Sequence, residues 1–438
     1  MNSQIFKRLT TTSQMMSIFG DESMLIAMLE FESALATAES RCEVFDPRIA
    51  ETISDCCQIS EFSISDLSEL AVQHGTVVVP LVKQLTKLVS VKDQAASGWV
   101  HFGATSQDVI DTAMIIQIKK ACALLENDIN RLVSALESLG RRFGSQVMIG
   151  RTLLQPSVPI TFGQKISGWK SAINRNWKRI EVSAKEALVL QFGGPSGNLS
   201  SLGLQGEQVR ETLSRIIDLP LPTDAWHVHR DRLVSLCSCI SILVGSLGKM
   251  ALDLSLLMQS EVGEVSEGNN SDGGRSSAMP HKRNPVNCLI ALTAAKRTPH
   301  LQATLLEAMV QEHERALGGW QAEWLTVPAI FEAAAGSISA IADMCGGLQI
   351  HPEKMLHNLD ALKGLFMSER IMLALSKKIG KESAREILEE ACSKVQSQDR
   401  HLSELLKLDT RFTQQIGSDE LDELMNIKGY LGTSSIGD

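Results

Sequence analysis

The longest uninterrupted pattern of apolar and polar positions in the chain runs from Asp108 to Leu139. This stretch contains neither glycine nor proline, and Gly140 follows it directly. Apolar residues recur in it every three or four positions, which is the spacing that places side chains on one face of an α-helix. They are Met114, Ile118, Ala121, Leu125, Ile129, Leu132, Leu136 and Leu139. The pattern therefore predicts one long helix that Gly140 ends.

Four further long helices are predicted by the same spacing. They cover about 162–180, 233–262, 286–313 and 328–347. The helix over 233–262 is apolar on most of its faces, so we expect it to lie at the centre of a bundle. Pro299 is an expected kink in the next helix, and Pro328 suits the first turn of the last one.

Shorter helical patterns occupy the two ends of the chain, and no alternating, β-branched pattern typical of strands competes with the helices. Aromatic residues, which favour strands, make up only 4% of the 438 residues. The sequence predicts an all-α fold in which a long central helical bundle, residues 106–348, lies between two smaller helical domains. These are residues 1–105 and residues 349–438.

The charge and the cysteine content indicate which binding partners and which cellular compartment to expect. The formal net charge of −9 argues against nucleic acid or an anionic membrane as the main partner. The nine cysteines form no CxxC pair, and the sequence shows neither a signal peptide nor an apolar run of about 20 residues. We therefore expect a soluble cytoplasmic protein with reduced thiols.

Residues 263–285 interrupt the helical pattern with a long polar connection, GEVSEGNNSDGGRSSAMPHKRNP. Antiparallel helices need only about 2–8 residues to connect them, so a loop of this length indicates a functional segment. The loop combines serine hydroxyls with a lysine and an asparagine at close spacing.

This loop resembles the signature of the fumarase/aspartase superfamily, and Ser276, Met279, Lys282 and Asn284 fall on its pattern. Arg275 departs from the pattern because it replaces the signature's glycine. Two more segments, VHFGATSQDVIDT (100–112) and GRTLLQPSVPITFG (150–163), resemble the other two active-site segments of the superfamily. The resemblance spans essentially the whole chain and implies the superfamily's all-α fold.

The resemblance also implies a function and an assembly. Superfamily members are homotetramers in which three subunits contribute segments to each active site. They remove a proton next to a carboxylate and expel a β-leaving group, or run that reaction backwards. Ser276 maps to the catalytic base, and Lys282 and Asn284 map to residues that bind a carboxylate and stabilise an enolate-like intermediate. Because free serine is a poor base, Lys282 is expected to activate it. No metal or organic cofactor is implied.

The second segment distinguishes among the members. Lyases that act on adenylosuccinate, argininosuccinate and fumarate carry a histidine in this stretch, where Leu153 stands between Thr152 and Gln155. Leucine cannot protonate a departing amine, so the leaving group should need no acid, as is true of a carboxylate. This favours the lactone-forming branch, which several other stretches of the chain also resemble. The expected substrate is a small polycarboxylate.

Further residues are candidates for binding the substrate. We expect Thr105, Ser106 and Gln155 to hold its carboxylates and Arg230 to be a further anion ligand. A role for His101 at the site is as plausible as a packed, hydrogen-bonded one, and Asp108 could either cap a helix or face the substrate. His227 and His229 lack the third ligand that a metal site needs.

Two other interpretations remain open at this point. The first is an adenylosuccinate lyase-like C–N lyase, which would need an acid other than Leu153. The second is a catalytically silent helical protein used structurally, against which the presence of Ser276, Lys282 and Asn284 argues.

Overall fold

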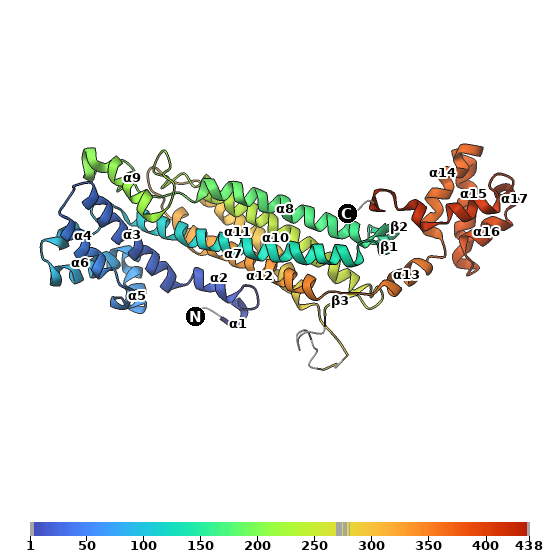
Figure 1. The fold of residues 1–438 in the computed structure, drawn as a ribbon, viewed down its shortest axis with the longest axis horizontal. Coiled ribbons are helices and arrows are strands. Elements are labelled where there is room, and N and C mark those ends of the chain that lie inside the picture. Colours follow the sequence, from blue (N-terminus) through green and yellow to red (C-terminus); the bar gives the residue numbers. More distant parts are fainter. Residues whose placement is uncertain (1–3, 269–273, 275–277, 280, 436–438) are drawn as a thin grey trace. The chain divides into compact units, whose positions relative to one another are not determined.

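The computed structural model describes residues 4–268, 274, 278–279 and 281–435. Helices dominate this part of the chain (Figure 1). In chain order the helices and strands are α1 (Gln4–Lys7), α2 (Ser13–Ile18), α3 (Asp21–Arg41), α4 (Pro47–Cys56), α5 (Ile64–His74), α6 (Val78–Lys92), α7 (Ser106–Phe143), β1 (Val147–Thr152), β2 (Gln155–Thr161), α8 (Phe162–Ala187), α9 (Gly206–Ile217), α10 (Asp231–Leu257), β3 (Val265–Ser266), α11 (Val286–Ala308), α12 (Gly319–Gly347), β4 (Gln349–Ile350), α13 (Pro352–Asp360), α14 (Ser368–Ile379), α15 (Lys381–Ser397), α16 (Leu402–Leu408), α17 (Thr410–Thr413) and α18 (Ser418–Leu424). The predicted all-α fold class is confirmed.

The chain forms two compact units, and each contains parts of the long helices. Unit 1 comprises Met1–Asn130, Asn174–Gly248 and Ile290–Ala340, and unit 2 comprises Arg131–Ile173, Lys249–Leu289 and Ile341–Asp438. These units do not test the three regions expected from the sequence, so that division stays a prediction.

In unit 1, α3 is the element on which neighbouring helices pack. Figure 1 shows α4, α5 and α6 grouped around it, and α9 contacts it as well. The ring of Phe31 on α3 meets Phe192 edge-on, with 6.4 Å between ring centroids. Close packing also joins the long helices: a Cβ on Gly248 of α10 would lie 2.4 Å from the Cβ of Ala295 on α11, so only glycine allows this approach.

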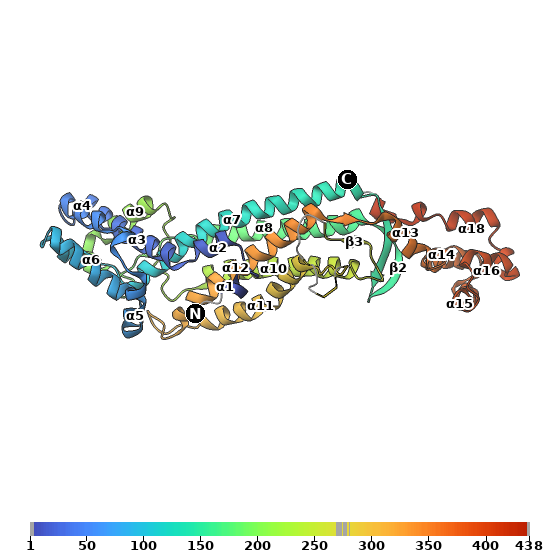
Figure 2. The same ribbon diagram turned by 90° about the horizontal axis from the view of Figure 1, so that it is seen from below.

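In unit 2, the short helices that follow α13 enclose their own hydrophobic core. Ile371, Leu375, Leu406 and Phe412 are fully buried in it, and Figure 2 shows α14, α16 and α18 together around this region. The chain then returns to the β1–β2 hairpin. The Thr161 backbone amide donates to Ser434 Oγ at 2.7 Å, and Thr161 Oγ1 donates to the Ser434 carbonyl at 2.8 Å.

All five predicted long helices are confirmed, with corrections at their ends. The helix that we expected to begin near Pro328 begins nine residues earlier, at Gly319, so Pro328 lies inside α12 instead of in its first turn. The helix expected to reach residue 313 ends at Ala308. A proline inside a helix removes one backbone donor, and packing offsets this local cost because α12 is buried along much of its length.

Two short pairs of antiparallel strands were not predicted. The strands β1 and β2 pair with each other, as do β3 and β4. The β1–β2 hairpin carries the second segment that resembles the superfamily. Its turn is Leu153-Leu154, and both residues have positive φ, 50° and 65°. Such turns usually contain asparagine and glycine, so no turn signal was visible in the sequence here.

Two helices, α10 and α12, are long and apolar enough to span a membrane by length and composition alone. More than half of the most apolar window of each is buried inside the protein, 56% in α10 and 78% in α12. Core helices of soluble proteins have the same properties, and the burial of both helices fits that explanation.

Candidate active site

The first segment leads into the start of α7, and the carboxylate of Asp108 holds this start in place. Asp108, in the first turn of α7, is fully buried. Its two oxygens accept hydrogen bonds from the backbone amides of Thr105, Gly193 and Gly194 at 2.9–3.0 Å, and Oδ1 lies 2.7 Å from Nε2 of His227. The bond to Thr105 is the reciprocal half of a capping box. Of the two roles left open for Asp108, the structure shows that of a helix cap. Its bonds also connect the start of α7 to residues 193–194 and to His227.

Thr105 and Ser106 lie at this helix start, as the sequence predicted. Ser106 is the first residue of α7 and is partly exposed. The Thr105 amide is bonded to Asp108, so its hydroxyl is the group left to face a ligand. Thr105 Oγ1 accepts a hydrogen bond from Arg315 Nη1 at 2.9 Å, and its own proton remains available for donation.

Arg315 is a candidate residue that the sequence analysis missed. It lies between α11 and α12, and its Nη2 donates to the Pro195 carbonyl at 3.0 Å while Nη1 reaches Thr105. No carboxylate of the described residues forms an ion pair with it. A guanidinium beside the Thr105 hydroxyl at the start of a 38-residue helix is suited to binding a carboxylate. The sequence signal was the polar segment HERALGG (313–319), which follows a long helix.

His101 lies four residues before Thr105 and is mostly buried. Its Nδ1 lies 2.7 Å from Oε1 of Glu32 on α3, and its φ of 60° is in the left-handed region. Burial lowers the pKa of His101, but the charges of Glu32 and Asp108 together with the hydrogen bond to Glu32 outweigh this effect and raise it. The ring is therefore hydrogen-bonded to Glu32, and its surroundings favour the charged form.

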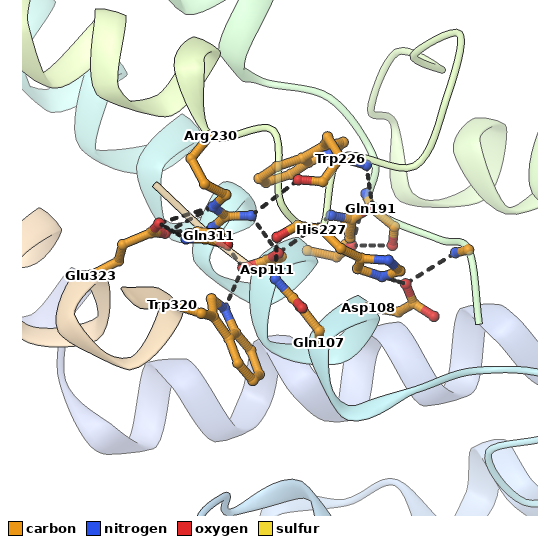
Figure 3. Close-up of polar contacts among 12 residues, drawn as sticks. Gln107, Asp108, Asp111, Gln191, Trp226, His227, Arg230, Gln311, Trp320 and Glu323 are labelled. Carbon is orange, nitrogen blue, oxygen red and sulfur yellow. Dashed lines mark hydrogen bonds and ion pairs between the residues drawn. The ribbon is translucent and has the colours of Figure 1, made fainter. Parts of the chain in front are cut away.

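Arg230 lies in a different buried network (Figure 3). Its guanidinium donates to Asp111 at 2.7 and 3.0 Å and to Glu323 at 3.0 Å, and it stacks on Trp226 at 4.5 Å from the ring centroid. Trp320 Nε1 also donates to Asp111, at 2.9 Å. Two carboxylates thus occupy the donors of an arginine that is only 2% exposed. The predicted role of Arg230 as an anion ligand is therefore not part of our proposal.

This network contains one guanidinium and two carboxyl groups. Burial raises the pKa of Glu323, while Arg230 acts in the opposite direction. Gln311 Nε2 donates to Glu323 Oε1 at 3.2 Å. Because Gln311 belongs to the same connection as Arg315, the network anchors one end of the segment that presents Arg315.

The second segment places its predicted residue at the hairpin turn of unit 2. Gln155 pairs with Thr152 across the turn and is exposed. Leu153 and Leu154 between them are 97% and 74% exposed, which is unusual for adjacent leucines. Next to this turn pair, Arg151 forms a two-bonded ion pair with the fully buried Glu264 at 2.7 and 2.9 Å.

The signature loop is described in part. Ser276 and Arg275 lie outside the described residues. Met279 is 44% exposed, Lys282 is exposed, and the Asn284 amide donates to the Gly274 carbonyl at 2.8 Å. The loop returns to α11, where the Asn287 amide donates to Glu267 Oε1 at 3.3 Å. Burial raises the pKa of Glu267.

Unit 1 thus brings together His101, Thr105, Ser106 and the unforeseen Arg315, while Arg230 is committed elsewhere in the same unit. Gln155, Met279, Lys282 and Asn284 belong to unit 2. Of the two histidines weighed as a metal pair, His227 bonds to Asp108 and His229 is exposed.

Comparisons with known proteins agree over nearly the whole chain. A family model described as lyase matches residues 7–298, and one described as adenylosuccinate lyase C-terminus matches residues 364–436. The 3-carboxy-cis,cis-muconate cycloisomerase of Pseudomonas aeruginosa is 39% identical, and the match covers 98% of this chain and 94% of that protein. The nitrosuccinate lyase of Streptomyces davaonensis is 33% identical over 94% of this chain and 89% of that protein.

A solved structure gives the same picture. The 3-carboxy-cis,cis-muconate lactonizing enzyme from Pseudomonas putida superimposes with a TM-score of 0.93 at 37% identity, covering 99% of this chain and 97% of that one.

Proposed function

We infer the function of this chain from the family to which it belongs, the fumarase/aspartase superfamily of lyases. We propose that it is a cycloisomerase that interconverts 3-carboxy-cis,cis-muconate and 4-carboxymuconolactone, a reaction of the protocatechuate branch of the β-ketoadipate pathway. The observation that carries this proposal is the near full-length similarity to the Pseudomonas aeruginosa cycloisomerase.

The reaction adds a carboxylate of the substrate to its own double bond and places a proton on the adjacent carbon. No electrons are gained or lost, so the proposal assigns no cofactor to it. Ser276 exchanges the proton, as acid in the lactone-forming direction and as base in the reverse one. Lys282 and Asn284 stabilise the charge that develops on the enolate-like intermediate.

The remaining carboxylates of the substrate need donors. The Thr105 hydroxyl, the guanidinium of Arg315 and the ring of His101 provide them at the start of α7, where the backbone amides of the first helical turn, including that of Ser106, favour an anion. Gln155 and Met279 complete the proposed binding residues. Arg315 is an addition that the contact with Thr105 supports.

Leu153 supports a leaving group that requires no proton. A carboxylate leaves as a weak base, because its pKa is near 4, whereas an amine has to be protonated. An exposed leucine at the hairpin turn cannot supply that proton. This argues against the C–N lyase interpretation, and the presence of Lys282 and Asn284 on the signature argues against a silent structural protein.

We also propose a homotetramer whose active sites are shared among three subunits. In its support, large apolar side chains lie exposed on three long helices, among them Leu252 on α10, Leu289 on α11 and Leu325 on α12. A light-scattering mass four times that of one chain is the expected result. We place the protein in the cytoplasm, since all nine cysteines are described and none forms a disulfide.

One assay tests the proposed function. Purified protein is given 3-carboxy-cis,cis-muconate, and the loss of its conjugated-diene absorbance is followed, with adenylosuccinate and nitrosuccinate in parallel. Turnover of the muconate alone is expected. Cleavage of adenylosuccinate or nitrosuccinate without effect on the muconate would replace the proposal with that lyase activity, and inertness towards all three would favour the structural interpretation. A Ser276→Ala variant with normal turnover would refute the assignment of that serine.

A further inference from the structure

Two buried carboxyl groups on α3, Glu32 and Glu39, lie outside the network of Figure 3. They are seven residues apart, so they share one face of the helix, and each is 1% exposed. Glu32 Oε1 lies 2.7 Å from Nδ1 of His101. Within the described part of the chain, Glu32 Oε2 and both oxygens of Glu39 have no hydrogen-bond partner. Burial without partners is costly for a charged carboxylate, so the two groups are not expected to be ionised together.

The surroundings assign different charges to the two groups. Burial, together with the charge of Glu32, raises the pKa of Glu39 to about 9, so Glu39 is a neutral acid at pH 7. Glu32 is the member of the pair whose carboxyl group contacts His101. The titratable groups that face His101 are Glu32 from α3 and Asp108 from α7, and both favour the imidazolium.

The geometry gives the two ring nitrogens of His101 different tasks. Nδ1 donates to Glu32, so the ring is held from one side. Nε2 lies on the opposite side of the ring, and no partner for it occurs among the described residues. The backbone of His101 is in the left-handed region, which costs about 1 kcal/mol or more for a residue with a side chain. Strain of this kind in a segment that leads directly to Thr105 indicates that the orientation of the ring matters.

We propose that Glu32 is a positioning residue that holds His101 as an oriented imidazolium, whose Nε2–H binds a substrate carboxylate beside Thr105 and Arg315. The inference rests on the proposed function, because it places a carboxylate of the substrate at the start of α7. Glu32 does not touch the substrate and acts through His101. The pairing would also give a protein with a net charge of −9 a second cation in the segment that leads to Thr105.

Glu32→Gln and Glu39→Gln form a matched pair of variants. Both remove a carboxyl group from the same face of α3 and keep its shape, and in Glu32→Gln the amide oxygen of the new side chain can still accept the bond from Nδ1. Only the first variant removes a charge. The pH titration of His101 is followed by NMR of ¹⁵N-histidine-labelled protein, with its signal assigned by a His101→Asn variant. We expect Glu32→Gln to lower the pKa of His101 to about its free value of 6.5 or below, and Glu39→Gln to leave it unchanged.

The second measurement is binding of butane-1,2,4-tricarboxylate, a saturated analogue that cannot react, by calorimetry at pH 5.5 and pH 8. Glu32→Gln is expected to weaken binding about tenfold at pH 8, because His101 of the variant is then neutral. At pH 5.5 the ring is charged in both proteins, so the variant should recover the parent affinity. A purely structural defect would not disappear at low pH. Glu39→Gln should stay within about twofold of the parent at both values.

The inference is overturned if Glu32→Gln leaves the titration of His101 unchanged, if its affinity loss is equal at both pH values, or if Glu39→Gln behaves like it. A parent protein that binds no tricarboxylate also overturns it. If parent and variants bind the analogue as expected, but the parent does not convert 3-carboxy-cis,cis-muconate, only the proposed function is overturned.

Discussion

The start of α7 and the tip of the β1–β2 hairpin carry two of the segments that resemble the superfamily's active site, yet they are built in opposite ways. At the start of α7, Asp108 is fully buried and each of its oxygens accepts two bonds. At the hairpin tip, Leu153 and Leu154 have left-handed backbones and side chains that are 97% and 74% exposed.

The difference shows which segment is complete within its own unit. The first segment satisfies the carboxylate of Asp108 internally and presents the Thr105 hydroxyl beside Arg315. The second presents strained, apolar residues whose exposure is unfavourable in water unless a ligand or another subunit covers them. Burial explains the first arrangement, whereas the second is explained by the proposed shared active site.

The largest expected effect comes from Asp108→Ala. It leaves three backbone amides and His227 without their acceptor, so we expect a loss of about 3–5 kcal/mol in the free energy of unfolding and turnover reduced to background. Urea unfolding followed by circular dichroism measures the first quantity. Asp231→Ala is the matched control, because Asp231 also begins a helix but is exposed, and it should cost less than about 1 kcal/mol. Equal losses in both variants would contradict the organising role of Asp108.

Arg315→Met should separate binding from stability at the first segment. The variant removes the guanidinium beside Thr105, so we expect KM to rise about 10–100-fold, with the free energy of unfolding changed by less than about 1 kcal/mol. Steady-state kinetics on 3-carboxy-cis,cis-muconate provides the test. Arg297→Met, which removes an exposed arginine of α11, should leave both quantities unchanged. An unchanged KM in Arg315→Met would remove Arg315 from the proposed site.

The double substitution Leu153→Asn and Leu154→Gly should replace the strained, apolar hairpin tip with a relaxed, polar one. Asparagine and glycine adopt positive φ readily, so we expect the free energy of unfolding to rise by about 1–2 kcal/mol while turnover falls. Leu204→Asn replaces another fully exposed leucine outside the hairpin and should change stability by less than about 0.5 kcal/mol. Higher stability with full activity would show that the leucines have no part in the site.

The smallest effect concerns pH. The pKa of His101 is raised in the folded protein, so its pairing with Glu32 contributes stability that is fully present below the unfolded value of about 6.5. That contribution is lost as the pH rises through the raised folded pKa. The stability difference between the parent and Glu32→Gln should therefore shrink as the pH rises above about 6.5, by on the order of 1 kcal/mol. A difference that grows with pH would reverse the assignment of charges.

The sequence predicted the parts of the fold that depend on local spacing. The helix over 108–139 was predicted because apolar residues follow one face without a breaker, and it is buried along that face in α7. The start of α12 was predicted too late because Pro328 was given its local preference, which packing overrides. The β1–β2 hairpin was missed because Leu153-Leu154 is a turn without turn residues.

The site was predicted where a motif carries the chemistry and missed where the chemistry arises from distant contacts. Thr105 and Ser106 lie at a helix start as expected, but Arg315 is 210 residues from Thr105 and no local pattern connects them. Arg230 shows the converse. Its charge favoured a ligand role in sequence, but Asp111 and Glu323 already occupy its donors in the folded chain.

Because Thr161 bonds to Ser434, the two segments can be completed at different times during synthesis of the chain. Among the described residues, every hydrogen-bond partner of Asp108 lies within 105–227, whereas the contact that closes the base of the β1–β2 hairpin joins positions 273 residues apart. At a synthesis rate of about 5–20 residues per second, Thr161 leaves the ribosome roughly 15–55 seconds before Ser434. During that interval the nascent chain can already build the first segment, while the second waits for a partner that has not yet been made.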